Sequence, residues 1–114
     1  MDIKWVDKLA RIYGVNGALL VDKDGLIIAD AGDTSEQVAP HSALMVKKLI
    51  SRIGLQAFEE WEWTQCESEG MVIAIANMDI GILVLVMDAD ANLGLVRIEA
   101  RRIRRTLREE FKRM

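Results

Sequence analysis

The sequence predicts an α+β fold in which an antiparallel sheet is covered on both faces. The observation that carries this prediction is the stretch 71–87, MVIAIANMDIGILVLVM, where two short runs rich in β-branched residues flank a polar turn at Asn77, Asp79 and Gly81. Both runs are apolar on both sides, whereas an antiparallel strand with one wet face alternates apolar and polar residues. Each face of this hairpin is therefore expected to be covered, most simply by helices.

Length and composition predict one ordered domain over residues 1–114. The chain is 51% hydrophobic and 29% charged, with one proline, which is typical of a folded soluble protein. The stretch 71–87 is not expected to span a membrane, because it is shorter than about 20 residues and carries Asp79 near its centre. A single cysteine, Cys66, and the absence of a recognisable signal peptide favour a cytoplasmic location.

The first elements are predicted to be a short helix and a second hairpin. Apolar residues recur in the helix at a spacing of three to four: Ile3, Val6, Leu9 and Ile12 or Tyr13. Gly14 is placed to end it. Segments 17–21 and 26–29 read as strands, joined by a tight turn in which Gly25 adopts a positive φ.

A second helix is predicted to begin between Val38 and Pro40 and to end at Ile53. It carries two adjacent apolar stripes, the first made by Ala39, Ala43, Val46, Ile50 and Ile53 and the second by Val38, Met45 and Leu49. One stripe is enough to pack on a sheet, so the second favours pairing with the same helix of another copy. Coverage by a neighbouring loop is the alternative.

Segment 60–65 alternates strictly and is predicted to be an edge strand. The alternation would place Trp61 and Trp63 on one face and Glu60 and Glu62 on the other. The acidic side chains would suppress unwanted pairing at the edge. The two tryptophans would either pack under a helix or form an interface.

The last segment is predicted to be the strongest helix, with Asp90 or Asn92 as its N-cap. Its apolar residues keep helical spacing over five turns: Leu93, Val96, Ala100, Ile103, Leu107 and Phe111. Residues 95–114 carry 8 basic and 3 acidic side chains, whereas residues 1–94 carry 7 and 15. The arginines are expected to be solvated or to meet carboxylates rather than nucleic acid, because the chain is acidic overall and aromatic residues do not interleave with them.

No catalytic, metal-binding or cofactor-binding residue is predicted. The segment from Asp88 to Glu99 resembles a calcium loop in spacing, but its glycine is at the seventh position rather than the sixth, so helix capping explains it better. In segment 22–25 the glycine is also at the wrong position for a calcium loop, and a tight turn explains the residues. His41 is the only histidine, and nothing indicates that it meets Cys66 or Ser42 in a catalytic pair. The glycines are scattered and form no phosphate-binding loop.

With this order of elements, the chain resembles the Roadblock family of small regulatory domains. The resemblance is carried by residues 14–29, GVNGALLVDKDGLIIA, by residues 81–87, GILVLVM, and by residues 92–97, NLGLVR. It implies a profilin-like α-β-β-α-β-β-β-α order with a five-stranded antiparallel sheet in the order 2-1-5-4-3. The middle helix would cover one face and the two terminal helices the other.

The resemblance also implies a function. Family members bind and regulate small Ras-like GTPases, acting in bacteria as activators of a polarity GTPase and in eukaryotes as dynein light chains or scaffold subunits, and they are not catalysts. They commonly dimerise through the middle helices and third strands, here 38–53 and 60–65. The implied dimer-interface residues are Val38, Ser42, Met45, Leu49, Trp61 and Trp63, and the implied partner-binding residues are His41, Leu44 and Lys48. The chain is thus expected to be a homodimeric GTPase regulator or adaptor; a structural subunit of a larger assembly is the alternative.

Overall fold

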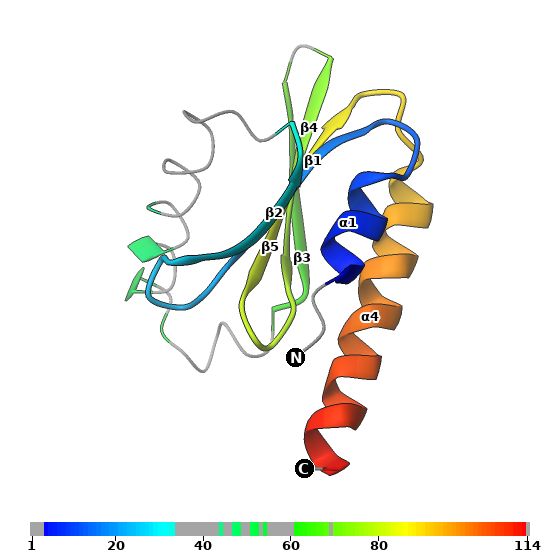
Figure 1. Cartoon of the computed structure of the whole chain (residues 1–114). Helices are drawn as coiled ribbons and strands as arrows, with labels where there is room; N and C mark the ends of the chain where they lie inside the picture. The colour runs from blue at the N-terminus through cyan, green and yellow to red at the C-terminus, as the bar shows by residue number, and fades with distance from the viewer. Residues whose placement is uncertain are drawn as a thin grey trace.

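The computed structural model describes residues 4–33, 44, 47–48, 51–52, 54, 61–68 and 70–113 (Figure 1). Its elements are α1 (Lys4–Ala10), β1 (Val15–Val21), β2 (Ile27–Gly32), β3 (Trp63–Ser68), β4 (Met71–Asn77), β5 (Ile82–Asp88) and α4 (Leu93–Arg113). The strands form one antiparallel sheet in the order β2-β1-β5-β4-β3. This confirms the predicted fold class and strand order.

The hairpin of β4 and β5 forms as the sequence predicts, with pairing from Met71 opposite Asp88 to Asn77 opposite Ile82. β5 lies at the centre of the sheet between β1 and β4. The turn after β4 needs Gly81, because a Cβ there would lie 2.5 Å from the backbone oxygen of Val21.

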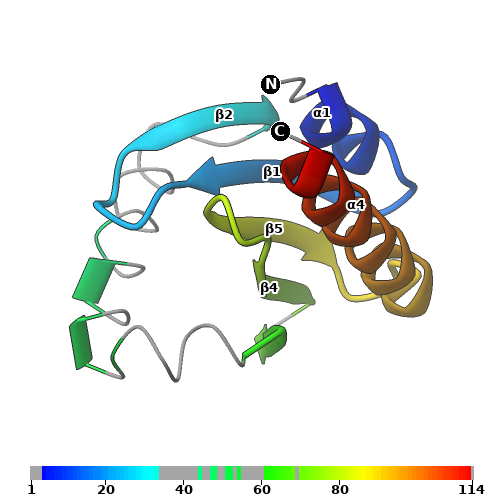
Figure 2. The same ribbon diagram turned by 90° about the horizontal axis from the view of Figure 1, so that it is seen from below.

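Side chains are buried on both faces of the sheet, as the two-sided apolar runs predicted. α1 and α4 lie beside each other on one face (Figures 1 and 2), where Val6, Leu9, Val96 and Leu107 join the larger core cluster. A smaller cluster comprises Leu19, Val21, Ile82 and Val84. The middle helix predicted for that second face falls mostly outside the described residues. Within 38–53 the structure describes residues 44, 47–48 and 51–52, and these are helical.

The first helix is shorter than its apolar pattern suggested. α1 ends at Ala10, and the chain then tightens, with the Arg11 N–H donating to the Lys8 carbonyl at 3.2 Å. Of the two candidates for the last apolar position, Ile12 packs against the core and Tyr13 is 81% exposed. Gly14 has a φ of +87°, and a Cβ on it would lie 2.6 Å from the Cβ of Ala91.

The prediction for the third strand was right about its position at an edge but wrong about its faces. β3 begins at Trp63 and continues to Ser68, so Trp61 and Glu62 precede the regular strand and do not follow its alternation. Trp61 packs against the smaller core cluster and Trp63 against the larger one. The two tryptophans therefore lie on opposite faces of the sheet.

α4 confirms the predicted last helix and selects Asn92 as its N-cap, because the Leu95 N–H donates to Asn92 Oδ1 at 3.0 Å. Its inward side buries Val96, Ala100 and Leu107. Among the described residues, no helix has both the length and the apolar character needed to cross a membrane.

Candidate protein-interaction site

The described residues hold no group of three histidine, cysteine or acidic side chains that could bind a metal ion. In both segments with partial calcium-loop spacing, an aspartate side chain makes hydrogen bonds within the fold. Asp22 Oδ1 accepts the N–H groups of Asp24 and Leu26, each at 2.9 Å, which makes the predicted turn. Asp88 Oδ1 accepts Asn16 Nδ2 at 3.0 Å. Of the residues considered for a catalytic pair, Cys66 is exposed on β3, and His41 and Ser42 lie outside the described residues.

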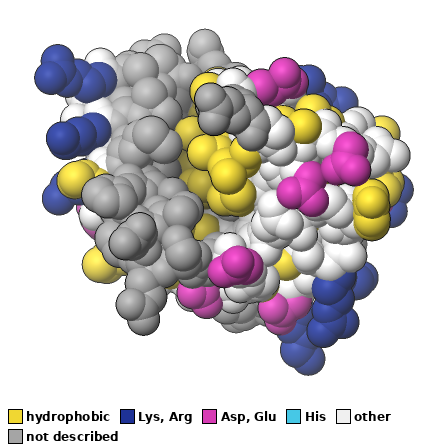
Figure 3. Space-filling view, turned by 90° about the horizontal axis from the view of Figure 1, so that it is seen from above, with side chains coloured by type: hydrophobic (Ala, Val, Ile, Leu, Met, Phe, Trp, Pro, Cys, Tyr) yellow, Lys and Arg dark blue, Asp and Glu magenta, His cyan; other side chains and the backbone are white. Residues whose placement is uncertain are grey.

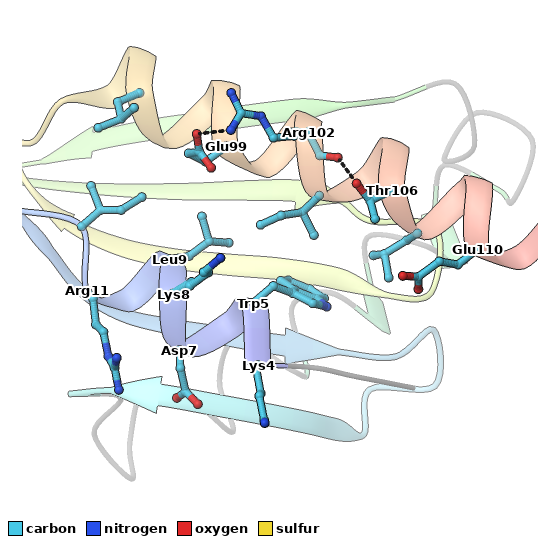
Figure 4. Close-up of a pocket in the computed structure, with 14 residues that line it drawn as sticks. Lys4, Trp5, Asp7, Lys8, Leu9, Arg11, Glu99, Arg102, Thr106 and Glu110 are labelled. Carbon is cyan, nitrogen blue, oxygen red and sulfur yellow. Dashed lines mark hydrogen bonds and ion pairs between the residues drawn. The ribbon is translucent and has the colours of Figure 1, made fainter.

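An open groove of about 920 Å³ lies between α1 and α4. Figure 4 shows the Trp5 indole in the space between the two helices, and Glu99 paired with Arg102 at 3.4 Å. Trp5 Nε1 is buried and has no hydrogen-bond partner in the described part of the chain. The described residues that line the groove carry apolar side chains, amines, guanidinium groups, carboxylates and one hydroxyl group.

The residues implied in dimer formation and partner binding are only partly described. Val38, Ser42, Met45, Leu49 and His41 lie outside the described residues. Leu44 is 52% exposed and Lys48 is exposed. Trp61 and Trp63 are half-buried at the start of β3, whose outer edge pairs with no other described strand.

The backbone that enters β3 is held by Asn77, the only polar side chain buried in the described part of the chain, at 2% exposed. Asn77 Nδ2 donates to the Trp61 carbonyl and the Asn77 backbone N–H to the Glu62 carbonyl, both at 3.0 Å. Asn77 Oδ1 accepts the Asp79 N–H at 2.9 Å. Because these groups are largely removed from water, leaving one without a partner costs about 1–3 kcal/mol.

Four arginines on one side of α4 face the same region. They follow steps of four, three and four residues, which places them on one helix face. The Arg97 guanidinium lies 5.8 Å from the Trp63 ring centroid, and Arg101 Nε donates to Glu62 Oε1 at 2.7 Å. Arg104 donates to Asp79 from Nε at 3.3 Å and from a terminal nitrogen at 3.2 Å. Arg108 also donates twice to this carboxylate.

These arginines change the acidity of the carboxyl groups that they contact. The hydrogen bond from Arg101 lowers the pKa of Glu62, against a smaller opposing effect of burial. Burial raises the pKa of Asp79, but the hydrogen bonds and charges of Arg108 and Arg104 outweigh it, so this pKa is also below its ordinary value. Both groups are therefore anionic near neutral pH and complement the cationic helix.

The sequence left two alternatives for these arginines, solvation or contact with carboxylates, and the structure shows carboxylate contacts for Arg101, Arg104 and Arg108. Arg105 is exposed and makes no ion pair with a described residue. Seen from above, acidic side chains are distributed over the described surface and basic ones lie toward its margins (Figure 3).

A model of the Roadblock/LC7 domain family matches residues 2–88, which include all five strands and α1. The chain belongs to the Roadblock/LC7 family. α4 lies beyond the matched residues, so its arginine contacts are features of this Roadblock/LC7 chain that the family match does not cover.

Solved structures share the fold across nearly all of the chain. Myxococcus xanthus MglB has a TM-score of 0.78 at 23% identity, covering 96% of this chain and 93% of that one. A Roadblock/LC7 domain from Streptomyces avermitilis has a TM-score of 0.74 at 17% identity, with 98% and 99% covered. An MglB structure with a tetrameric arrangement has a TM-score of 0.73 at 21% identity, with 92% and 83% covered. Comparison with curated proteins finds no match.

Sequence reasoning about this Roadblock/LC7 chain missed the contacts of Asn77, Asp79 and Glu62, which it read as turn and edge residues. A signal was present in the spacing of Arg97, Arg101, Arg104 and Arg108 on one helix face. That spacing indicates a shared partner surface, but it does not identify carboxylates that lie 25–39 residues away in the sequence.

Proposed function

We propose that this Roadblock/LC7 chain is a homodimeric, non-enzymatic regulator or adaptor that binds a small Ras-like GTPase in the cytoplasm. The observation that carries the proposal is the family match over residues 2–88. The resemblance to this family implies binding of such a GTPase, and the open groove between α1 and α4 offers apolar and charged side chains for contact with a protein.

Pairing of two copies is proposed through the middle helix and the β3 edge. Val38, Ser42, Met45 and Leu49 would supply the helix contacts, and Trp61 and Trp63 would lie at the start of the paired edge. The outer edge of β3, which pairs with no other described strand, supports this arrangement, since backbone groups on a strand edge can pair with another chain. The tetrameric arrangement of one similar MglB structure supports self-association in this fold.

The GTPase is proposed to bind the outer side of the paired middle helices, through His41, Leu44 and Lys48. Exposure of Leu44 and Lys48 supports this role, because an apolar side chain beside an amine gives a contact with both buried area and charge.

Affinity capture with the full chain as bait tests the proposal. Lysate of the source organism is divided, and its GTPases are loaded with GDP or with a non-hydrolysable GTP analogue before capture. The proposal expects one small Ras-like GTPase to be enriched in one nucleotide state. Capture that ignores the nucleotide would favour the alternative of a structural subunit, and failure to enrich any GTPase would contradict the proposal.

A further inference from the structure

We propose that Asn77, together with Asp79 that the arginines of α4 hold, positions the segment 61–63 and thereby sets how tightly two copies pair through β3. This inference rests on the homodimer of the proposed function and adds positioning residues that lie outside the paired edge itself. It gives α4 a role in dimer formation, although α4 lies with α1 on one sheet face and the proposed dimer contacts are made by the middle helix and the β3 edge.

The first step is that segment 61–63 depends on contacts from β4 rather than on the regular ladder alone. Pairing of β3 with β4 begins at Trp63 opposite Ala76. Before that residue, the backbone is fixed by Asn77, which binds the carbonyl groups of both Trp61 and Glu62. Trp61 Nε1 also donates to Thr64 Oγ1 at 2.6 Å, so the placement of the indole depends on the same local geometry.

The second step is that α4 fixes the turn that contains Asp79. This residue has a φ of +67°, a backbone conformation that residues other than glycine adopt infrequently, although aspartate and asparagine tolerate it better than most. Its N–H is held by Asn77 and its carboxylate by Arg104 and Arg108. The turn is thus restrained from the strand side and from the helix side.

The third step is that segment 62–63 and the end of β4 are closely packed against α4. The cavity lined by segment 62–63, the end of β4 and the arginines of α4 has a volume of only about 10 Å³, about the smallest space that holds one water molecule. A shift of residues 97–104 of α4 therefore has little free space to absorb it before segment 62–63 moves.

The test is the dimer dissociation constant of the full chain, measured by sedimentation equilibrium. Asp79→Asn keeps a residue that tolerates positive φ but removes the charge that Arg104 and Arg108 share. The inference expects the dissociation constant to rise at least threefold. Arg105→Gln is the matched control on the same helix, and it should leave the constant unchanged. An unchanged constant for Asp79→Asn would overturn the inference.

A second pair of variants covers the case in which Asp79→Asn does not fold. Glu62→Arg and Arg101→Glu alter a pair of exposed side chains, 41% and 52% exposed, so each should fold. Each alone should weaken the dimer, and the two together should restore it at least partly, a rescue that general destabilisation does not produce. Absence of rescue would count against the positioning role.

Amide hydrogen exchange of Asn77 at low protein concentration separates this inference from the dimer itself. Its N–H is bonded to the Glu62 carbonyl, so exchange should accelerate in Asp79→Asn even in a monomer. A wild-type chain that remains monomeric at all concentrations would contradict the proposed homodimer. A wild-type dimer with exchange and dissociation constant unchanged in Asp79→Asn would overturn the positioning role alone.

Discussion

Arg104 of α4 and Asp79 of the β4–β5 turn form the most enclosed ion pair among the described residues. The Arg104 side chain is 12% exposed and that of Asp79 33% exposed, and two hydrogen bonds at 3.2 and 3.3 Å join them. Arg101 and Glu62 also pair closely, but in more solvent, at 52% and 41% exposed. The contribution of the arginine face to stability should therefore be concentrated at Asp79.

Asp79→Asn should lower the free energy of unfolding by about 1–2 kcal/mol, because it leaves the enclosed Arg104 guanidinium without its counter-charge. Arg101→Gln should cost less than about 1 kcal/mol, as is usual for an exposed pair. Asp24→Asn is the control, since its side chain is exposed in the β1–β2 turn. Urea unfolding of the three variants measures the differences, and an equal loss for all three would contradict the ranking.

Stability should also decrease in acid because of these carboxylates. The pKa values of Asp79 and Glu62 are lower in the folded chain than in the unfolded chain, so their contributions are complete above the ordinary values near pH 4. Their contributions to the free energy of unfolding are lost as the pH falls below that range, toward the pKa values of the folded chain. Urea midpoints measured between pH 3 and 7 should show a steeper acid loss for wild type than for Asp79→Asn. Parallel curves would contradict the assignment.

The arginine face should not bind nucleic acid. Arg101, Arg104 and Arg108 already meet carboxylates of the chain, so binding phosphates would require these pairs to break. Affinity for mixed-sequence DNA or RNA, measured by fluorescence anisotropy, should be negligible at about 0.15 M salt. Submicromolar binding that is abolished by replacing these arginines, and that has the steep salt dependence of phosphate contacts, would contradict this interpretation.

Met45→Glu and Leu49→Glu should each give a folded monomer, because a carboxylate placed in the proposed apolar helix pair would be desolvated without a partner at a cost of several kcal/mol. Lys48→Glu is the control in the same segment, since Lys48 is exposed. Light scattering should give the 12.8 kDa of one chain for the first two variants and twice that mass for the control. An unchanged dimer mass for both variants would remove the middle helix from the interface.

The sequence predicts the sheet and the helix α4 well because their signals are local. The run 71–87 is apolar on both sides and β-branched, and these properties specify two buried strands with little dependence on distant residues. The apolar spacing from Leu93 to Leu107 likewise specifies one buried helix face. Both elements form where the patterns place them.

The error at Trp61 and Trp63 shows where local patterns fail. Alternation predicts one face for both residues only if both belong to a regular strand. The ladder ends with the bond from the Asn77 N–H to the Glu62 carbonyl, and the Asn77 side chain binds the Trp61 carbonyl instead. The pair of Arg101 and Glu62 joins residues 39 positions apart. Such contacts depend on strand order and helix placement, so they follow from the fold and not from spacing in the sequence.

The most direct measurement of the central claim is a calorimetric titration of this chain with the GTPase recovered by affinity capture, in its GDP-bound and GTP-analogue-bound forms. If this chain binds a surface of the GTPase that changes with the bound nucleotide, its affinities for the two nucleotide states must differ. The proposed function predicts at least a tenfold difference in dissociation constant, with the chain binding as a dimer. Equal affinity for the two forms, or no heat of binding with either, would contradict the assignment of this chain as a GTPase regulator.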